Sequence, residues 1–269
     1  MQSVLVVGGT RFIGRATVAE FREHGYDVTL CNRGHHPNPF AGDDAVELVE
    51  ADRREDEQLR AAAEAVEPDV VVDLVAYHPR DVRVATDIFA DSEAYVFVSS
   101  GAAYAADEIP KREGETPLKS CSESEAVDDS HETYGERKAE GDRAVFAAAD
   151  EGIRAMSVRP TIVYGPHDYT ERLDYWLARV DSHGAVVVPG DGGSLHQLVY
   201  VEDVASALRV VAERGTAGEA YNVGDRDAQP LGDLLDLLAA ACETDVRQAY
   251  ASERELSPDL EPDDFPLYR

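Results

Sequence analysis

The feature that most constrains the fold is a glycine-rich turn that comes directly after the first apolar run of the chain. The run Ser3–Val7 is almost wholly aliphatic, as expected of a strand buried on both faces. The turn reads Gly8-Gly9-Thr10-Arg11-Phe12-Ile13-Gly14, and helical spacing of apolar residues follows it to His24. A strand, a tight turn and a helix in this order predict the opening of a βαβ unit.

Three glycines of this turn each have a physical reason to be glycine. Gly8 permits the tight bend, Gly9 lets the backbone approach a pyrophosphate, and Gly14 lets the helix pack against the strand. The free N–H groups and the positive dipole end of the helix N-terminus favour phosphate. A turn that serves packing alone is the alternative, but its place after the first strand favours a dinucleotide site.

Strands and helices alternate along the chain up to about residue 160. Parallel strands joined by helical crossovers explain such an alternation. We therefore predict an α/β protein with a doubly wound parallel Rossmann sheet and a small C-terminal substrate lobe. The expected strands are Asp27–Cys31, Ala45–Glu50, Asp69–Val75, Ala94–Ser99 and Ile153–Val158, and the expected helices are Arg11–His24, Glu55–Val66, Arg80–Ala90 and His131–Glu151.

Two stretches interrupt the alternation. Residues 105–130 are acidic and polar, and they predict a loop long enough to have a function of its own. After Pro160 the pattern becomes irregular, with helices expected at Glu171–Val180, Glu202–Arg214 and Gly232–Ala241, and strands at Ala185–Val188, Gln197–Tyr200 and Tyr221–Val223. We expect residues 1–165, with returning segments at about 196–224, to form the dinucleotide-binding domain. Residues 166–195 and 225–269 are expected to form a small, shortened lobe.

The charge of the chain restricts its partners. It has 54 acidic and 25 basic side chains and a net charge of −29, and only three of the basic residues are lysines. The acids are spread over every segment, which is typical of a surface adapted to high salt, although an ordinary acidic protein is the alternative. No basic stripe is present to meet nucleic-acid phosphates. We therefore expect no nucleic-acid partner.

Cysteine, histidine and apolar patterns narrow the class further. The three cysteines are far apart, and the eight histidines show no metal-binding spacing, so we expect neither a disulfide framework nor a metal site. No apolar run approaches the length of a membrane span, and no signal peptide precedes the first strand. We expect a cytoplasmic protein with no membrane partner, and a homodimer is left open.

The end of the second expected strand bears on the choice of dinucleotide. Asn32-Arg33 stands where an acidic residue would hold the ribose 2′-hydroxyl of NAD, and an arginine there suits the 2′-phosphate of NADP. Arg11 can add a second positive charge. The sequence therefore favours NADP over NAD, unless Arg33 simply faces solvent. Asp52, after the third strand, is placed to accept from the adenine amino group or, alternatively, to cap the following helix.

Three polar residues suggest chemistry at the sheet edge. Tyr134 and Lys138 are four apart on an expected helix, so they share one face. An adjacent ammonium lowers the pKa of a phenol from its usual value of about 10 toward the working range. Ser100 follows the fifth expected strand, at the carboxyl edge where open sheets bind ligands. There its hydroxyl can hydrogen-bond the substrate oxygen whose proton Tyr134 handles.

Seven motifs follow one another along the chain: Gly8-Gly9-Thr10-Arg11-Phe12-Ile13-Gly14, Val98-Ser99-Ser100, Tyr134-Gly-Glu-Arg-Lys138, Arg159-Pro-Thr-Ile-Val-Tyr-Gly-Pro166, Pro189-Gly-Asp-Gly192, Gln197-Leu-Val-Tyr-Val-Glu-Asp-Val204 and Ala220-Tyr-Asn-Val-Gly224. In this order they resemble the extended short-chain dehydrogenase/reductases of the NAD-dependent epimerase/dehydratase family, from residue 1 to about 240. The resemblance implies that Tyr134 is the catalytic acid/base. It implies that Lys138 orients the nicotinamide ribose and lowers the tyrosine pKa, and that Ser100, rather than Ser99, assists.

The candidate binding residues form two sets. Cofactor contacts are expected from Gly8, Gly9, Thr10, Arg11, Phe12, Ile13, Gly14, Asn32, Arg33, Asp52, Lys138 and Pro160, the last because the resemblance implies that Arg159–Gly165 lines the nicotinamide side. Substrate contacts are expected from Ser100, Tyr164, Asp168, Arg172 and Gln197. Arg172 can bind a phosphate or carboxylate through two hydrogen bonds. An ion pair with Asp168, four residues earlier, is the alternative use of its charge.

These observations predict an NAD(P)-dependent epimerase, dehydratase or reductase that acts on a sugar or sugar nucleotide, with the net reaction left open. Three features depart from the family pattern. Arg11 replaces the middle glycine of the turn, as in a subgroup that includes chloroplast stem-loop-binding proteins. The interval from Ser100 to Tyr134 is long, and the chain ends at Arg269, short of the usual substrate lobe. A non-catalytic NAD(P)-binding regulatory or RNA-associated protein is the alternative.

Overall fold

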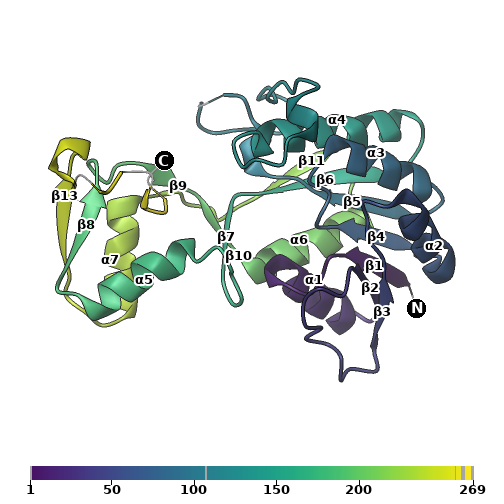
Figure 1. Ribbon diagram of the computed structural model, residues 1–269, viewed down its shortest axis with the longest axis horizontal. Helices are drawn as coiled ribbons and strands as arrows, with labels where there is room; N and C mark the ends of the chain where they lie inside the picture. The colour runs from purple at the N-terminus through teal and green to yellow at the C-terminus, as the bar shows by residue number, and fades with distance from the viewer. Residues whose placement is uncertain (1, 107, 258, 262–263, 268–269) are drawn as a thin grey trace. The chain divides into compact units, whose positions relative to one another are not determined.

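The computed structural model describes residues 2–106, 108–257, 259–261 and 264–267, and the chain divides into two compact units (Figure 1). The first unit comprises Met1–His167 and Val199–Val223, and the second comprises Asp168–Leu198 and Gly224–Arg269. The chain therefore leaves the first unit once, returns to it for about one strand, a helix and another strand, and leaves it again.

The first unit is built on a parallel sheet of seven strands in the order β11-β6-β5-β4-β1-β2-β3. The ends of the central strands are level, since Val7 of β1 pairs with Cys31 of β2 and with Asp73 of β4. The loops that follow these strands meet at one side, which we call the carboxyl edge. The strands are β1 (Ser3–Val7), β2 (Asp27–Asn32), β3 (Val46–Glu50), β4 (Val70–Asp73), β5 (Ala94–Val98), β6 (Ala155–Pro160) and β11 (Ala220–Val223).

Helices cover both faces of the sheet, because successive strand residues point to opposite sides and both sides are apolar. Phe21 and Leu208 are fully buried on one face, and Leu59, Val82 and Val145 on the other. The first face packs against α1 (Phe12–Glu23) and α6 (Val201–Arg214), and the second against α2 (Asp56–Val66), α3 (Pro79–Ile88) and α4 (Tyr134–Asp150) (Figure 1). The predicted doubly wound parallel Rossmann sheet is confirmed.

The polar segment between β5 and α4 has little regular structure, in agreement with the expected loop. It contains the short 3-10 turns η1 (Gly101–Ala103) and η2 (Glu125–Val127) and a bridge between Tyr104 and Leu118. Residue 107 lies outside the described residues. The His78 ring nitrogens lie 3.2 Å from the Ala126 carbonyl and 2.9 Å from the Asp129 carboxylate, so this segment is attached to the start of α3.

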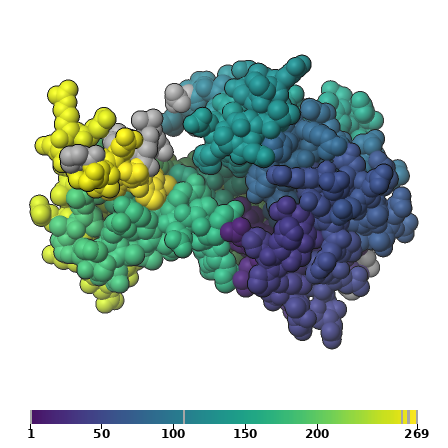
Figure 2. Space-filling model, in the orientation of Figure 1, coloured from purple at the N-terminus to yellow at the C-terminus, as the bar shows by residue number. Residues whose placement is uncertain are grey.

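The second unit has a small core around Trp176. The indole ring stacks on Phe265 with 6.3 Å between ring centres, and its Nε1 atom donates to the Pro266 carbonyl at 2.8 Å. The parallel pair of β8 and β13 brings green and yellow atoms side by side in Figure 2. The elements are α5 (Arg172–Ser182), β8 (Ala185–Pro189), β9 (Leu195–His196), β12 (Gln229–Pro230), α7 (Leu231–Ala241), β13 (Arg247–Ala251) and η3 (Glu253–Glu255).

Several boundaries differ from the sequence-based prediction. The strand expected from Gln197 begins at Leu198 as β10 (Leu198–Tyr200), which pairs with the unexpected strand β7 (Ile162–Tyr164). Strands β12 and β13 were also unexpected, because two to five residues with mixed burial give too short a periodicity to detect. Within the described ranges, the structure has no helix that is both long and apolar enough to cross a membrane.

Candidate functional site

The turn after β1 adopts backbone angles that favour glycine. Gly8 and Gly9 have φ angles of +116° and +87°. A Cβ atom on Gly14 would lie 2.5 Å from the Cα of Gly9, so the first turn of α1 sits directly on the glycine turn. Arg11 is the N-cap residue of α1 and has an extended backbone. The free N–H groups of the helix therefore begin right after the turn, as a pyrophosphate site requires.

The other residues of the turn divide between core and solvent. Phe12 is buried, and Ile13 packs against the same apolar cluster, so both anchor the start of α1 to the sheet. Thr10 is partly exposed and Arg11 is exposed. The two polar residues, Thr10 and Arg11, are therefore the ones whose side chains can reach a bound phosphate.

A cavity of about 290 Å³ lies where β2 and β3 end, and it is lined by Arg33, His35, Glu50, Ala51, Asp52 and Gln58. The Arg33 side chain is half exposed, and its guanidinium lies 3.9 Å from the Asp52 carboxylate at the border of this cavity. A role in binding the dinucleotide stays a prediction. Asn32 accepts a hydrogen bond from the Gly34 N–H at 2.8 Å, which fixes the turn before the cavity. Glu50 adds a second carboxylate, which works against a 2′-phosphate.

The alternative that Asp52 caps the following helix is wrong. The N-cap residue of α2 is Glu55, three residues later. Asp52 instead accepts a hydrogen bond from the Arg54 N–H at 3.0 Å, in a turn closed on its own backbone, while its own N–H donates to Gln58. Its carboxylate therefore belongs to the cavity and not to the helix terminus.

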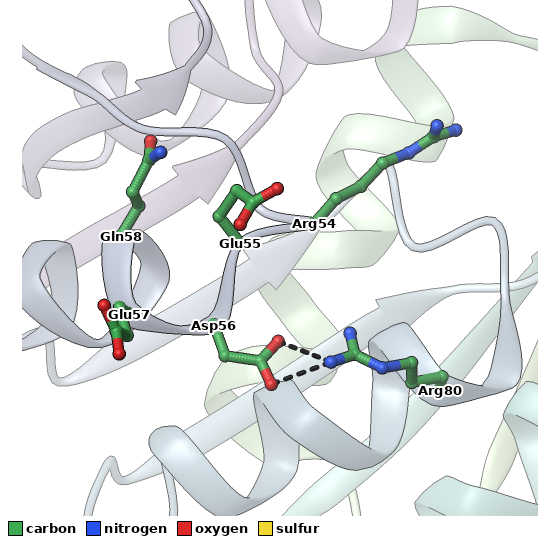
Figure 3. Close-up of a pocket in the computed structure, with 6 residues that line it drawn as sticks. All are labelled: Arg54, Glu55, Asp56, Glu57, Gln58 and Arg80. Carbon is green, nitrogen blue, oxygen red and sulfur yellow. Dashed lines mark hydrogen bonds and ion pairs between the residues drawn. The ribbon is translucent and has the colours of Figure 1, made fainter.

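A slightly larger cavity of about 330 Å³ opens beside the first turn of α2 (Figure 3), and it is lined by Arg54, Glu55, Asp56, Glu57, Gln58 and Arg80. Arg80 donates to both oxygens of Asp56 at 2.8 and 3.0 Å. The lining has three carboxylates and two guanidinium groups. Both arginines are already ion-paired, Arg80 with Asp56 and Arg54 with Asp129 at 3.6 Å, which makes the cavity a poor match for phosphate. None of the site residues predicted from the sequence lines this cavity. It shares one lining residue, Gln58, with the cavity at the ends of β2 and β3.

Tyr134 and Lys138 come together with the end of β5 at the carboxyl edge. Tyr134 is the first residue of α4, and the Nζ atom of Lys138 lies 5.7 Å from the centre of its ring. The same Nζ donates hydrogen bonds to the carbonyls of Val98 at 2.7 Å and Ala76 at 3.0 Å. Burial lowers the pKa of Lys138 to about 8, with nearby carboxylates opposing the shift. The ammonium is thus fixed in place by two backbone carbonyls, and its pKa lies below the usual value for lysine.

The two serines after β5 differ in exposure. Ser99 is buried, whereas Ser100 is partly exposed and caps η1 by accepting a hydrogen bond from the Ala102 N–H at 3.1 Å. The Ser100 hydroxyl therefore belongs to the more accessible of the two side chains, and its assisting role stays a prediction.

A buried polar network that the sequence did not reveal joins α4 to β6. Arg159 donates to Asp142 at 2.8 Å and to the Tyr104 hydroxyl at 2.9 Å, and the hydroxyl donates to Asn222 at 2.7 Å. Asp142 also accepts from Ser157 at 2.6 Å, and burial raises its pKa while Arg159 opposes the rise. These residues lie on four separate segments, and only Arg159 and Asn222 belong to motifs that the sequence analysis singled out.

A second buried charge cluster lies between β4 and α3. Arg53 is ion-paired with Asp73 and, at 3.2 Å, with Asp81, and all three side chains are less than one tenth exposed. Asp73 also accepts a hydrogen bond from the Tyr95 hydroxyl at 3.0 Å. Asp73 explains why β4 ends two residues before the predicted strand does. In the sequence, Asp73 lies in an expected strand, Asp81 in an expected helix and Arg53 between two elements, so nothing there indicated that the three charges meet.

The remaining predicted residues lie in both units. In the first, Pro160 is buried at the end of β6, and the Tyr164 ring lies 5.5 Å from that of Tyr200. In the second, Arg172 donates to Thr170 at 3.2 Å, and Thr170 donates to Asp168 at 2.7 Å. The ion pair between Asp168 and Arg172, which was the alternative to substrate binding, is thus replaced by a threonine bridge.

Gln197 precedes β10 and donates from its side chain to the Asp225 carbonyl at 2.6 Å. This bond links two segments of the second unit that are 28 positions apart in the sequence. Within the described ranges, the structure shows no group of three side chains arranged to hold a metal ion.

The sequence of the chain is similar to a known protein family and to several characterised proteins. The profile of the family described as "NAD dependent epimerase/dehydratase family" matches residues 4–224. The chain is 26% identical over 253 residues to the chloroplast stem-loop binding protein of 41 kDa b of Arabidopsis thaliana, covering 90% of this chain but only 62% of that protein. It is 24% identical to a 2-alkyl-3-oxoalkanoate reductase of Stenotrophomonas maltophilia, over 88% of this chain and 75% of that protein.

The fold is also similar to that of a solved structure. The dTDP-glucose 4,6-dehydratase of Bacillus anthracis, in complex with NAD, superposes with a TM-score of 0.77 at 17% identity, covering 100% of this chain and 94% of that one. At this level of identity the likeness concerns the fold alone.

Proposed function

The chain belongs to the NAD-dependent epimerase/dehydratase family, and from this premise we propose that it is an NAD(P)-dependent enzyme acting on a sugar nucleotide. The observation that carries the proposal is the position of Lys138, whose ammonium is fixed between two backbone carbonyls beside the Tyr134 ring. This pair lies at the carboxyl edge of the sheet, where open sheets bind their ligands, and this supports a role in binding or catalysis. The net reaction is epimerisation, dehydration or reduction.

The glycine turn fits a nicotinamide dinucleotide. Side chains at Gly8, Gly9 or Gly14 would collide with neighbouring atoms, so only backbone faces the start of α1. There the N–H groups would hold the pyrophosphate, with Thr10 and Arg11 at the accessible side. Asn32, Arg33 and Asp52 would bind the adenosine end, and Pro160 would border the nicotinamide. When bound, the nicotinamide ring accepts or returns a hydride at its C4 atom.

The chain's own residues manage the proton. Tyr134 would take the proton from a substrate hydroxyl, or give it back, at its phenolic oxygen. The Lys138 ammonium, 5.7 Å from the centre of the Tyr134 ring, would favour the phenolate over the phenol. Ser100 would hydrogen-bond the substrate oxygen and hold it in line with the phenol. Each step needs only groups that lie within the first unit.

The adenosine end is proposed to prefer NADP. Arg33 borders the cavity at the end of β2, and Arg11 stands in the turn. Two guanidinium groups suit a 2′-phosphate better than a 2′-hydroxyl. Glu50 and Asp52 reduce this preference, since both add negative charge to the same cavity.

We further propose that the second unit supplies substrate contacts. Arg172 is the first residue of α5, and Asp168 precedes that helix. Gln197 precedes β10, and Tyr164 ends β7 in the first unit. The second unit is the smaller of the two, and it has its own core. Arg172→Ala is expected to weaken substrate binding if the guanidinium meets a phosphate or carboxylate.

The direct test is Tyr134→Phe, which removes only the phenolic oxygen. Turnover of a nucleotide-sugar panel, followed by product analysis in molar KCl, should fall by about 10²- to 10⁴-fold. Binding of NADP, followed by calorimetry, should be unchanged. Tyr169→Phe is the matched control, because Tyr169 is an exposed tyrosine of the second unit with no assigned role. Equal turnover by Tyr134→Phe and the unmodified chain would remove the catalytic assignment.

A second candidate function rests on one observation, the similarity to a protein named for stem-loop binding. A non-catalytic NAD(P)-binding or RNA-associated role would need a surface that meets phosphates, and the net charge of −29 opposes this. Titration of a stem-loop RNA at matched salt separates the two candidates. Tight RNA binding without turnover of any nucleotide sugar would reverse their order.

A further inference from the structure

The ammonium group of Lys138 is fully buried, which requires that its charge be balanced inside the protein. Its two hydrogen bonds go to neutral carbonyls, those of Ala76 and Val98. Around it stand the rings of Tyr77, Phe97 and Tyr134, with centres 4.7 to 5.7 Å from Nζ. Neither the carbonyls nor the rings carry a formal charge.

Four ionised groups face Lys138 from the elements packed around it. Asp73, Asp142 and Asp81 favour its charged form, and Arg53 disfavours it. Asp142 is engaged with Arg159 at 2.8 Å, so that pair is already neutral. Of the remaining three groups, the carboxylates of Asp73 and Asp81 outnumber the single guanidinium of Arg53 by one, and Lys138 supplies the second positive charge. The buried guanidinium of Arg137, next to Lys138 in α4, instead donates to backbone carbonyls.

The same two carboxylates hold the backbone of the loop between β4 and α3. Asp81 accepts hydrogen bonds from the N–H groups of Tyr77 and His78, both at 3.1 Å, and Asp73 accepts from that of Val75 at 3.2 Å. Arg53 is ion-paired with both carboxylates and also donates to the Asp81 carbonyl at 3.3 Å. One guanidinium therefore links the two ends of this loop.

The loop held in this way carries one of the two oxygens that receive the lysine. Ala76 lies between the bound N–H groups of Val75 and Tyr77, and its carbonyl accepts from Lys138. On the other side, the Tyr77 carbonyl accepts from Arg137 of α4 at 2.9 Å. The position of the ammonium relative to β5 thus depends on the loop, and the loop depends on the buried carboxylates.

We propose that Arg53, Asp73 and Asp81 are positioning residues for Lys138. They hold its ammonium in place through the β4–α3 loop, and their one uncompensated negative charge balances its positive charge. The inference rests on the proposed role of Lys138 beside Tyr134. All three side chains are less than one tenth exposed, so they act through the lysine and not on a ligand directly. They act on the chemistry by keeping the lysine charged and correctly placed.

The scarcity of lysine makes the electrostatic part testable without substrate. The chain has three lysines, Lys111, Lys119 and Lys138, so a protein labelled with ¹³C at lysine Cε gives three signals that can be followed against pH in molar KCl. Lys138→Arg assigns the signal, and the other two lysines serve as internal references. Lys138 should titrate at about pH 8 in the unmodified chain.

Asp73→Asn keeps the shape of the side chain and removes its charge. Because a negative charge that favours the ammonium is lost, the midpoint of Lys138 should fall by about one pH unit. Asp87→Asn is the matched control, since Asp87 lies in α3 with its side chain 78% exposed, and it should leave the midpoint unchanged. A midpoint in Asp73→Asn equal to or above that of the control would overturn the proposal.

The positional part is tested by amide exchange. Arg53→Met should speed exchange at the Tyr77 and His78 amides about fivefold, because the carboxylate that binds them loses its anchor. Arg154→Met is the control, as Arg154 donates to the carbonyls of Ala212 and Gly215, away from the loop. Equal acceleration in both variants would contradict the proposal, and if Arg53→Met does not fold, the Asp73→Asn titration decides alone.

The outcomes separate this inference from the proposed function. Neither measurement involves turnover, so a failed titration with an inactive Tyr134→Phe variant refutes only the positioning set. The expected titration with an active Tyr134→Phe variant supports the charge balance and refutes the catalytic role it was meant to serve.

Discussion

Two ion pairs of the first unit have the same length but opposite surroundings. At the carboxyl edge, Arg159 and Asp142 are 2.8 Å apart, with side chains at most 2% exposed. On the outer surface, Arg80 and Asp56 are also 2.8 Å apart, but their side chains are 57% and 42% exposed. Water and salt compete for the surface pair, whereas the buried pair has no other partner of comparable strength. Distance alone therefore says little about what a charge does in this protein.

The comparison divides the charges of the chain into two groups with different tasks. The exposed acids interact mainly with solvent and ions, and they set how the whole molecule responds to salt. The buried charges fix the backbone segments that carry Tyr134 and Lys138. High salt should change the behaviour of the first group and leave the second almost untouched.

The largest expected effect is that of breaking the buried pair. Asp142→Ala leaves the guanidinium of Arg159 buried without its carboxylate, and it should lower the free energy of unfolding by about 3–5 kcal/mol. Urea unfolding in molar KCl measures the loss. The double variant Asp142→Leu, Arg159→Met removes both charges and should recover much of it. A loss below about 1 kcal/mol in the single variant would place this pair with the surface pairs.

Salt should act on the exposed group as a whole. With 54 acids against 25 basic residues, self-repulsion favours unfolding in dilute buffer, and molar KCl shortens the repulsion to about 3 Å. The melting temperature should rise by roughly 10 °C from dilute buffer to molar KCl, which corresponds to about 3 kcal/mol for a chain of this size. A flat or falling melting temperature would show that the acidic surface is not adapted to salt.

The smallest effect is expected at a single surface pair. Asp56→Ala removes the partner of Arg80 and should change the free energy of unfolding by less than about 1 kcal/mol in molar KCl. The same urea experiment measures it beside Asp142→Ala. If both variants lost equal stability, exposure would not be the property that separates the two groups.

The sequence predicted those features that local pattern determines. The aliphatic run of β1 and the glycines at 8, 9 and 14 gave the opening unit, because strand burial and tight turns impose their composition on neighbouring residues. The spacing of Tyr134 and Lys138 likewise placed both on one face of α4. Local pattern also gave the alternation of strands and helices, with ends shifted by a few residues.

Features built from distant residues were not predictable in this way. Arg53, Asp73 and Asp81 are separated by 20 and 8 positions, and each has an ordinary local explanation as a loop, strand-end or helix-start residue. The bond from Arg159 to Tyr104 joins residues 55 positions apart. Asp52 was ambiguous for the opposite reason, since a helix cap and a ligand-facing carboxylate have the same local sequence.

The measurement that tests the function most directly is a calorimetric titration of NADP and of NAD in molar KCl, with the unmodified chain and with Arg33→Gln. We expect both dinucleotides to bind at one site, with NADP the tighter. Because Arg33 is half exposed at the cavity, its replacement should not disturb the fold. It should weaken NADP about tenfold and leave NAD unchanged. Tighter binding of NAD would contradict the role of Arg33, and no binding of either dinucleotide would contradict the proposed function itself.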